Sequence, residues 1–242
     1  MQTELSWKIL TRYIKNTPLQ RNFKLSKLYN SNIILKREDL QKGRSFKIRG
    51  SLNKCLKIKH TTKTVVCPSA GNHAQGVAFS CNLLNMDCKI FLPKTTPAQK
   101  IEKIKYYGKK NIDIVVYGNN FDESLGESID YSRKNNYTLI HPYDDLDIIE
   151  GQSTIGFEIN KILKPDYVIV PVGGGGLISG IGSYLKNTKI IGVESENTNS
   201  LQLSLMNNEI RSIDNIDTFV DGVSVRRIGD LTFEICKQFM DE

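Results

Sequence analysis

The chain has 242 residues and a formal net charge of +7, with 39% hydrophobic and 24% charged residues. This length allows a sizeable core in one large or two small domains, and the composition is ordinary for a soluble globular protein. No apolar run approaches the length of a membrane span, and the first residues lack the pattern of a signal peptide, so we expect a cytoplasmic protein without a membrane partner.

The positive charge does not predict a nucleic-acid partner, because the lysines are scattered along the chain rather than gathered into one patch. The densest group is expected to be a solvated helix end; it comprises Lys54, Lys57, Lys59 and Lys63.

The cysteines are odd in number and form no C-x-x-C pair, which indicates reduced thiols rather than disulfides or a zinc site. They are Cys55, Cys67, Cys81, Cys88 and Cys236. Cys67 and Cys81 lie in apolar surroundings and are expected to be small buried hydrophobes. The three histidines show no metal-ligand spacing, so no metal site is expected.

Short β-branched runs alternate with helical stretches from residue 64 onward, which predicts an α/β fold with a mostly parallel sheet. In a first block we expect strands at 64–67, 88–92, 112–117 and 137–140, separated by helices at 72–84, 98–107 and 121–135. This block could close as a small doubly wound domain. It is followed by an expected helix at 148–163, a strand at 166–172, a helix at 177–185, a strand at 189–193 and a helix at 231–240.

Four consecutive glycines, Gly173 to Gly176, follow a predicted buried strand. Such a turn leaves backbone N–H groups free to bind an anion, with a helix N-terminus behind them. A tight turn alone needs only one glycine. Four glycines increase the backbone entropy lost on folding without an evident structural benefit, so we favour a phosphate site. The spacing fails the G-x-G-x-x-G fingerprint, yet Glu194 ends the next strand where a ribose-binding acid would lie, so a nucleotide site stays an alternative.

A second polar segment, Ser-Ala-Gly-Asn-His-Ala-Gln-Gly from Ser69 to Gly76, joins a strand to a helix. Its N–H groups and polar side chains could bind a carboxylate or a ring hydroxyl, but Ser69 and Asn72 could equally cap the helix. Lys47, in Ser-Phe-Lys-Ile-Arg-Gly, is a candidate amine nucleophile. An amine, a polar loop and a phosphate-sized turn are together what pyridoxal phosphate requires.

These segments resemble the fold-type II pyridoxal phosphate enzymes, which share a tryptophan synthase β-like architecture, and among them the biosynthetic threonine dehydratases. The similar stretches cover nearly the whole chain in collinear order: 36–39, 45–50, 69–79, 120–122, 151–152, 171–177 and 221–230. The resemblance implies two doubly wound domains, a large cofactor-binding domain from residues 1–63 and 142–242 and a small inserted domain from 64–141. The family continues past the position of Glu242, so the large domain is expected to be truncated at its C-terminus.

The resemblance also implies roles for individual residues. Lys47 would hold pyridoxal 5'-phosphate covalently and act as the catalytic base, with Phe46 beside the ring and Asn72 on the ring hydroxyl. The phosphate would be gripped by Gly173, Gly174, Gly175, Gly176 and Leu177. The substrate carboxylate would be surrounded by Ser69, Ala70, Gly71, Asn72 and His73.

The reaction implied is dehydration and deamination of L-threonine to 2-oxobutanoate and ammonia, the first step of isoleucine biosynthesis. Serine is a possible further substrate, and the full-length form is expected to be a homo-oligomer. One alternative is a catabolic serine/threonine dehydratase or serine racemase-like enzyme, although Ala70 stands where racemases carry a second serine. Another is a non-catalytic truncated fragment, because the partner of the pyridine nitrogen would lie beyond Glu242.

Overall fold

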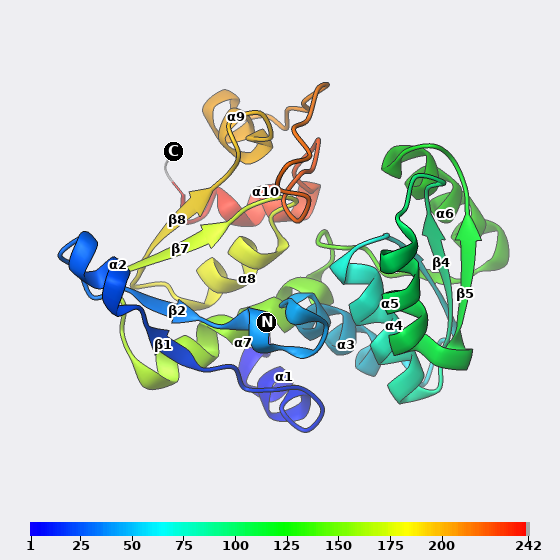
Figure 1. Cartoon of the computed structure of the whole chain (residues 1–242), viewed down its shortest axis with the longest axis horizontal. Helices are drawn as coiled ribbons and strands as arrows, with labels where there is room; N and C mark the ends of the chain where they lie inside the picture. Colours follow the sequence, from blue (N-terminus) through cyan, green and yellow to red (C-terminus); the bar gives the residue numbers. More distant parts are fainter. Residues whose placement is uncertain (241–242) are drawn as a thin grey trace.

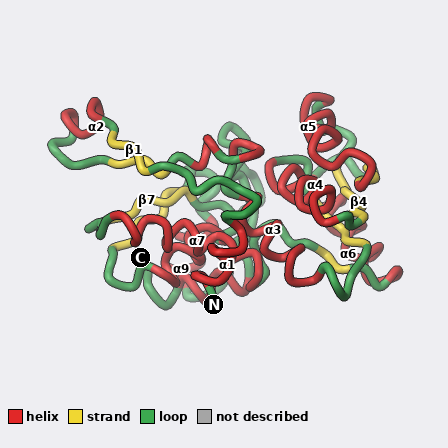
Figure 2. Tube along the Cα trace, turned by 90° about the horizontal axis from the view of Figure 1, so that it is seen from below, coloured by secondary structure: helices red, strands yellow, loops and turns green. Residues whose placement is uncertain are grey.

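The computed structural model describes residues 1–240, and its helices and strands form two groups joined through helix α3 (Lys47–Ile58). Figure 1 shows the first group, built around β4 and β5, on one side of the molecule and the second, around β7 and β8, on the other. The same separation is visible from the perpendicular direction in Figure 2.

The first group is a four-stranded parallel sheet with the strand order β5-β4-β3-β6. Its strands are β3 (Thr64–Pro68), β4 (Asp87–Leu92), β5 (Ile112–Val116) and β6 (Thr138–Leu139). The intervening helices are α4 (Asn72–Leu84), α5 (Ala98–Gly108) and α6 (Phe121–Asn135), with a short 3-10 turn at Lys109–Asn111. The alternation predicted for this block is confirmed, and the continuous apolar run of β3 reflects a strand buried on both faces.

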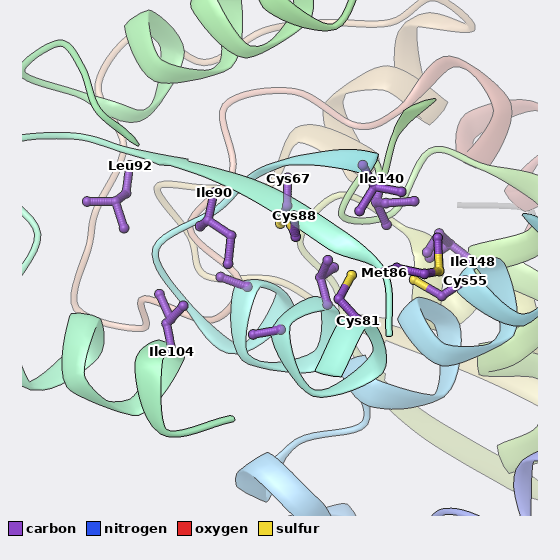
Figure 3. Packing of buried hydrophobic residues seen from close by; sticks show 14 residues of the cluster. Cys55, Cys67, Cys81, Met86, Cys88, Ile90, Leu92, Ile104, Ile140 and Ile148 are labelled. Atoms are coloured by element: carbon purple, nitrogen blue, oxygen red, sulfur yellow. The ribbon is translucent and has the colours of Figure 1, made fainter. Parts of the chain in front are cut away.

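The core of this sheet contains four of the five cysteines (Figure 3). Cys67 and Cys81 are fully buried between β3 and α4, so their prediction as small buried hydrophobes is confirmed. All five thiols in the described residues are free and buried. Burial raises the pKa of Cys67 far above that of an exposed thiol, which makes it a poor nucleophile.

The second group contains the first sixty residues, whose elements the apolar pattern did not predict. They are α1 (Thr3–Leu10), β1 (Leu19–Arg21), α2 (Phe23–Leu28) and β2 (Ile34–Lys36), with β1 and β2 antiparallel. Two 3-10 turns, Glu38–Leu40 and Lys42–Arg44, lead into α3.

The later part of the second group is built on α7 (Leu146–Ile162), which packs against α1, α3 and α8. It continues with β7 (Tyr167–Pro171), α8 (Gly176–Tyr184), β8 (Lys189–Val193), α9 (Ser200–Asn207) and α10 (Asp230–Cys236), and β7 and β8 pair in parallel. The last helix was predicted to extend to residue 240, but α10 ends at Cys236. Over residues 1–240, no helix combines the length and apolar character that a membrane crossing requires.

Two lysines expected at a solvated helix end are instead paired with acids. Lys54 lies 2.9 Å from Asp145 and 3.0 Å from Asp147, and Lys57 lies 2.8 Å from Asp147 and 2.6 Å from Glu150. The expectation was wrong for these two residues because the acidic start of α7 lies across from the end of α3, a contact that the local sequence does not reveal. The division into domains 1–63 with 142–242 and 64–141 stays a prediction, although the four-stranded sheet uses only residues 64–139.

Candidate active site

The amine of Lys47 is directed at the backbone of the segment between β6 and α7. Lys47 is the first residue of α3, and its Nζ donates a hydrogen bond of 2.9 Å to the carbonyl oxygen of Pro142. The same Nζ lies 5.4 Å from the ring centroid of Phe46. Burial lowers the pKa of Lys47 to about 8, because the charged ammonium loses its water. A neutral, nucleophilic amine is therefore accessible close to physiological pH.

A buried charge network fixes the helix that carries Lys47. Arg49, also on α3, is only 1% exposed, and its guanidinium donates to Glu38 and to Glu158 with distances of 2.8 to 2.9 Å. Lys36 also pairs with Glu158. Burial alone would lower the pKa of Arg49, but its contacts with Glu38 and Glu158 raise it, so the guanidinium remains charged. The stretch 36–39 thereby gains a physical role, since Lys36 and Glu38 anchor α3.

The glycine run forms the turn between β7 and α8. Gly175 has a left-handed backbone with φ of +88°, and α8 begins at Gly176 without a side-chain cap on its first turn. Unpaired N–H groups at a helix start are suited to a phosphate. The glycines are also needed for close packing: a Cβ on Gly174 would lie 2.3 Å from Cδ1 of Tyr143, and one on Gly176 would lie 2.9 Å from its Cβ. The expectation that a structural turn would need only one glycine was therefore wrong.

The segment from Ser69 places its residues at the start of α4. The N-cap position belongs to Gly71 and has no side-chain cap, and the Ser69 hydroxyl accepts a 3.2 Å bond from the Gly71 N–H. The capping alternative for Ser69 and Asn72 is therefore wrong, and the first N–H groups of α4 lack a side-chain partner. Asn72 is exposed and lies with Ser45 along a surface crevice too narrow to hold a water molecule, and neither Lys47 nor the glycine run lines this crevice.

His73 is a buried residue rather than a surface one. It is 3% exposed, and its Nε2 makes a 3.0 Å hydrogen bond to the carbonyl oxygen of Ile140. Burial and the nearby charge of Lys47 lower its pKa to about 3, so the ring is neutral at physiological pH. Its Nδ1 is buried without a hydrogen-bond partner in the structure. The interpretation of His73 as an ordinary satisfied or surface histidine was thus only half right.

The connector between β6 and α7, residues 140–144, was missed by the sequence interpretation. The carbonyls of Ile140 and Pro142 hold His73 and Lys47 as described above. The ring of Tyr143 lies against the glycine run, and burial raises the pKa of its phenol to about 12, so it stays protonated. No local signal marks this connector, because the contacts that tie it to Lys47, His73 and the glycine run are with distant parts of the chain.

The last residue of the connector ties it to the end of the fold. Asp144 accepts bonds of 3.1 Å from the backbone N–H groups of Asp230 and Thr232 at the start of α10. A carboxylate at a helix N-terminus satisfies unpaired N–H groups and complements the helix dipole. The connector thus contacts α3, α4, the glycine run and α10 within five residues.

Glu194 does not have the role that the nucleotide alternative assigned to it. Its carboxylate accepts bonds of 3.0 and 2.9 Å from the N–H groups of Leu201 and Gln202, and so caps α9. The position of Glu194 at the end of β8 is thus explained by the start of α9 and needs no nucleotide to account for it. Among residues 1–240, no group of three or more histidine, cysteine or acidic side chains is placed to hold a metal ion.

The donor set fits pyridoxal phosphate. Lys47 supplies an amine of lowered pKa, the uncapped turn at Gly175 and Gly176 supplies N–H donors for a phosphate, and the uncapped start of α4 supplies donors for a second anion. Lys47 contacts Pro142, and the glycine run contacts Tyr143. These two connector residues are consecutive, with Cα atoms about 3.8 Å apart, so the amine and the turn lie on the same short segment.

Known proteins match this chain closely. The family model described as pyridoxal-phosphate dependent enzyme matches residues 10–242. The biosynthetic L-threonine dehydratase IlvA of Halalkalibacterium halodurans is 43% identical over 237 residues, which cover 95% of this chain and 57% of the relative. The protein of the same name from Staphylococcus epidermidis is 45% identical over 245 residues, covering 96% and 58%. The chain thus spans somewhat more than half the length of these curated relatives.

Solved structures agree in fold. The processed form of threonine deaminase isoform 2 from Solanum lycopersicum superposes with a TM-score of 0.93 at 40% identity, covering 99% of this chain and 72% of that one. Maize serine racemase superposes with a TM-score of 0.91 at 27% identity, covering 99% and 74%. The expected fold-type II architecture is confirmed, and this chain belongs to the family of pyridoxal-phosphate dependent enzymes.

Proposed function

We propose that this chain carries the catalytic site of a threonine dehydratase, which converts L-threonine to 2-oxobutanoate and ammonia as the first step of isoleucine biosynthesis. The observation that supports it best is the partly buried amine of Lys47, held at Pro142 next to the residue that contacts the glycine run, with a pKa lowered to about 8. The names of the relatives that are 43 to 45% identical favour threonine over other amino acids.

The chain's residues would divide the work as follows. Lys47 would hold the cofactor until the substrate amine takes its place there, and the Nζ so freed, when neutral, would take the proton from Cα of the substrate, which the lowered pKa favours. The N–H groups at Gly175, Gly176 and Leu177 would bind the phosphate, with Gly173 and Gly174 shaping the turn. Pyridoxal phosphate, when bound, supplies the electron-withdrawing ring that takes up the charge left on Cα.

The substrate carboxylate would meet the uncapped start of α4, where Ser69, Ala70 and Gly71 precede the helix. Asn72 would bind the ring hydroxyl, and Phe46 would lie beside the ring. His73 would orient this loop through its bond to Ile140 and not act as a base, because its pKa of about 3 leaves it a very weak one. A racemase-like activity is less favoured, since Ala70 offers no hydroxyl on the opposite face.

We also infer a cytoplasmic enzyme that works as a homo-oligomer. Free, buried thiols are ordinary for a reducing compartment and support the first inference. The second is supported by exposed apolar side chains on β7 and β8, among them Ile169, Ile191 and Val193, since such patches mark surfaces that become covered. Light scattering of the purified protein tests it, and a monomer at all concentrations would contradict it.

The proposed function is tested by fixing the cofactor with borohydride and mapping the adduct by mass spectrometry. We expect one adduct, on Lys47, and threonine-dependent release of 2-oxobutanoate. Lys47→Ala should abolish both, whereas Lys59→Ala, a change of an exposed lysine just after the same helix, should alter neither. An adduct on another lysine, or turnover by Lys47→Ala, would contradict the assignment.

A further inference from the structure

The segment between α9 and α10 forms a closed loop beside the glycine run. Its ends meet where the N–H of Ile213 donates a 2.9 Å bond to the carbonyl of Arg226, next to an antiparallel bridge between Ser212 and Arg227. Inside it, the Ser224 hydroxyl contacts two backbone carbonyls of the loop at 2.7 and 2.9 Å. A surface loop with joined ends and internal packing is an Ω-loop, a type that is frequently functional. In Figure 1 it lies between α9 and α10.

One side of the 213–226 loop rests on the glycine run. A Cβ added to Gly173 would lie 3.0 Å from Cα of Val223 and 3.1 Å from its carbonyl oxygen, so the two backbones are in direct contact. Just beyond the loop, the hydroxyl of Tyr143 donates a 3.3 Å bond to the carbonyl of Arg227. A displacement of this loop would therefore change the surroundings of the turn proposed to bind phosphate.

The other side of the loop is tied to the four-stranded sheet group by two ion pairs. Lys100 on α5 lies 2.9 Å from Asp221, and Arg226 lies 3.1 Å from Asp122 on α6. All four side chains are at least one-third exposed, so each pair is weak on its own and is screened by salt. Two such pairs nevertheless attach α5 and α6 to the loop. Because the loop also contacts Gly173, the pairs favour an arrangement in which these helices stay near the glycine run.

We propose that the 213–226 loop is a latch, in which Lys100–Asp221 and Arg226–Asp122 hold the sheet group against the phosphate-binding turn. Asp221 and Arg226 are then positioning residues that act through Val223 and Gly173. The identity of the ligand as pyridoxal phosphate rests on the proposed function, whereas the latch itself rests only on the contacts above. Breaking one pair should weaken cofactor binding about two- to fivefold, the range expected for an exposed pair close to a site.

A charge swap across one pair separates the latch from a general effect on stability. Lys100→Glu and Asp221→Lys each place like charges face to face, and we expect each to raise the dissociation constant of pyridoxal phosphate about two- to tenfold. The double variant restores an opposite pair with reversed signs, and its dissociation constant should return to within about twofold of the original. Lys103→Glu makes the same charge change on an exposed residue of α5 that has no described ion-pair partner, and it should bind as the unmodified protein does.

Hydrogen exchange of peptides from the 213–226 loop provides a readout that needs no cofactor. Exchange should be faster in both single variants and return to the original rate in the double variant. If neither the unmodified protein nor any variant binds pyridoxal phosphate, the proposed function fails. The exchange data still test the latch in that case, because they need no cofactor. Single variants with unchanged loop exchange, or a double variant that binds cofactor as weakly as the singles, would overturn the latch.

Discussion

Arg49 offers a sharp test of how helix α3, which carries Lys47, is held in place. Its guanidinium is 1% exposed and bridges Glu38 with Glu158, while Lys36 provides the second positive charge. The two negative charges of this cluster are balanced by its two positive charges. Arg49→Met removes one positive charge and so leaves one uncompensated negative charge in a buried cluster. Removing one partner of a buried ion pair costs about 3–5 kcal/mol, because the remaining charge loses its partner without regaining water. We expect the free energy of unfolding to fall by about that amount.

The assay can use the single tryptophan of the chain. Nε1 of Trp7 donates a 3.2 Å hydrogen bond to Glu158, so its fluorescence reports on the network as urea unfolds the protein. Arg37→Met is the matched control, since Arg37 makes an exposed pair with Asp39 in the same stretch, and it should leave the urea midpoint unchanged.

A second substitution distinguishes lost charge balance from lost volume. Arg49→Met combined with Glu38→Gln returns the cluster to neutrality, because Lys36 then faces Glu158 alone. The double variant should therefore be more stable than Arg49→Met by itself, although each change removes hydrogen bonds. A loss below about 1 kcal/mol for Arg49→Met, or a double variant less stable than the single, would refute this reasoning.

Three further predictions follow from the site. The rate of adduct formation on Lys47 should rise about tenfold per pH unit below about pH 8 and then level off, because only the neutral amine attacks; a flat profile from pH 6 to 9 would contradict the lowered pKa. Gly174→Ala places a Cβ 2.3 Å from the Tyr143 ring, so cofactor affinity should fall about tenfold and be partly regained with Tyr143→Ala, in a titration by absorbance. In the folded protein the pKa of His73 is about 3, against an ordinary value of 6.5. Below pH 6.5 the unfolded chain therefore binds a proton that the folded protein does not. The free energy of unfolding should fall by about 1.4 kcal/mol for each unit by which the pH is lowered, down to about pH 3. His73→Asn should show a smaller slope in urea unfolding, and parallel slopes would count against the buried neutral ring.

Elements with a strong local pattern could be predicted from the sequence. The helices at 72–84 and 121–135 were predicted with the bounds that the structure has, the second because the Asn120 side chain caps it and a left-handed Asn136 ends it. The strands of the parallel sheet are short, mainly apolar runs between such helices. In contrast, β1 and β2 have three residues each, too few for an alternating pattern to be recognised, and they were missed.

The residues of the candidate site also fall into those that the sequence could predict and those that it could not. The glycine run stands out by residue type, whereas Lys47 could be singled out only through the motifs around it, since it is one of many lysines. Pro142, Tyr143 and Asp144 do not stand out, since each acts through a partner far away in the chain. Lys54 and Lys57 illustrate the opposite error, in which an ordinary local pattern conceals long-range pairing with the start of α7.

The compactness of the 140–144 connector has a mechanical consequence. Pro142 holds the Lys47 amine through its carbonyl, Tyr143 covers the glycine run with its ring, and Asp144 caps α10 with its carboxylate. Because the three residues are consecutive, a shift of one of these contacts displaces the backbone that carries the other two. The pKa of the amine depends on its burial at Pro142, and the shape of the phosphate turn depends on Tyr143. The proposed nucleophile and the proposed phosphate site are therefore both held by one short segment, although the two motifs lie more than a hundred residues apart in the chain.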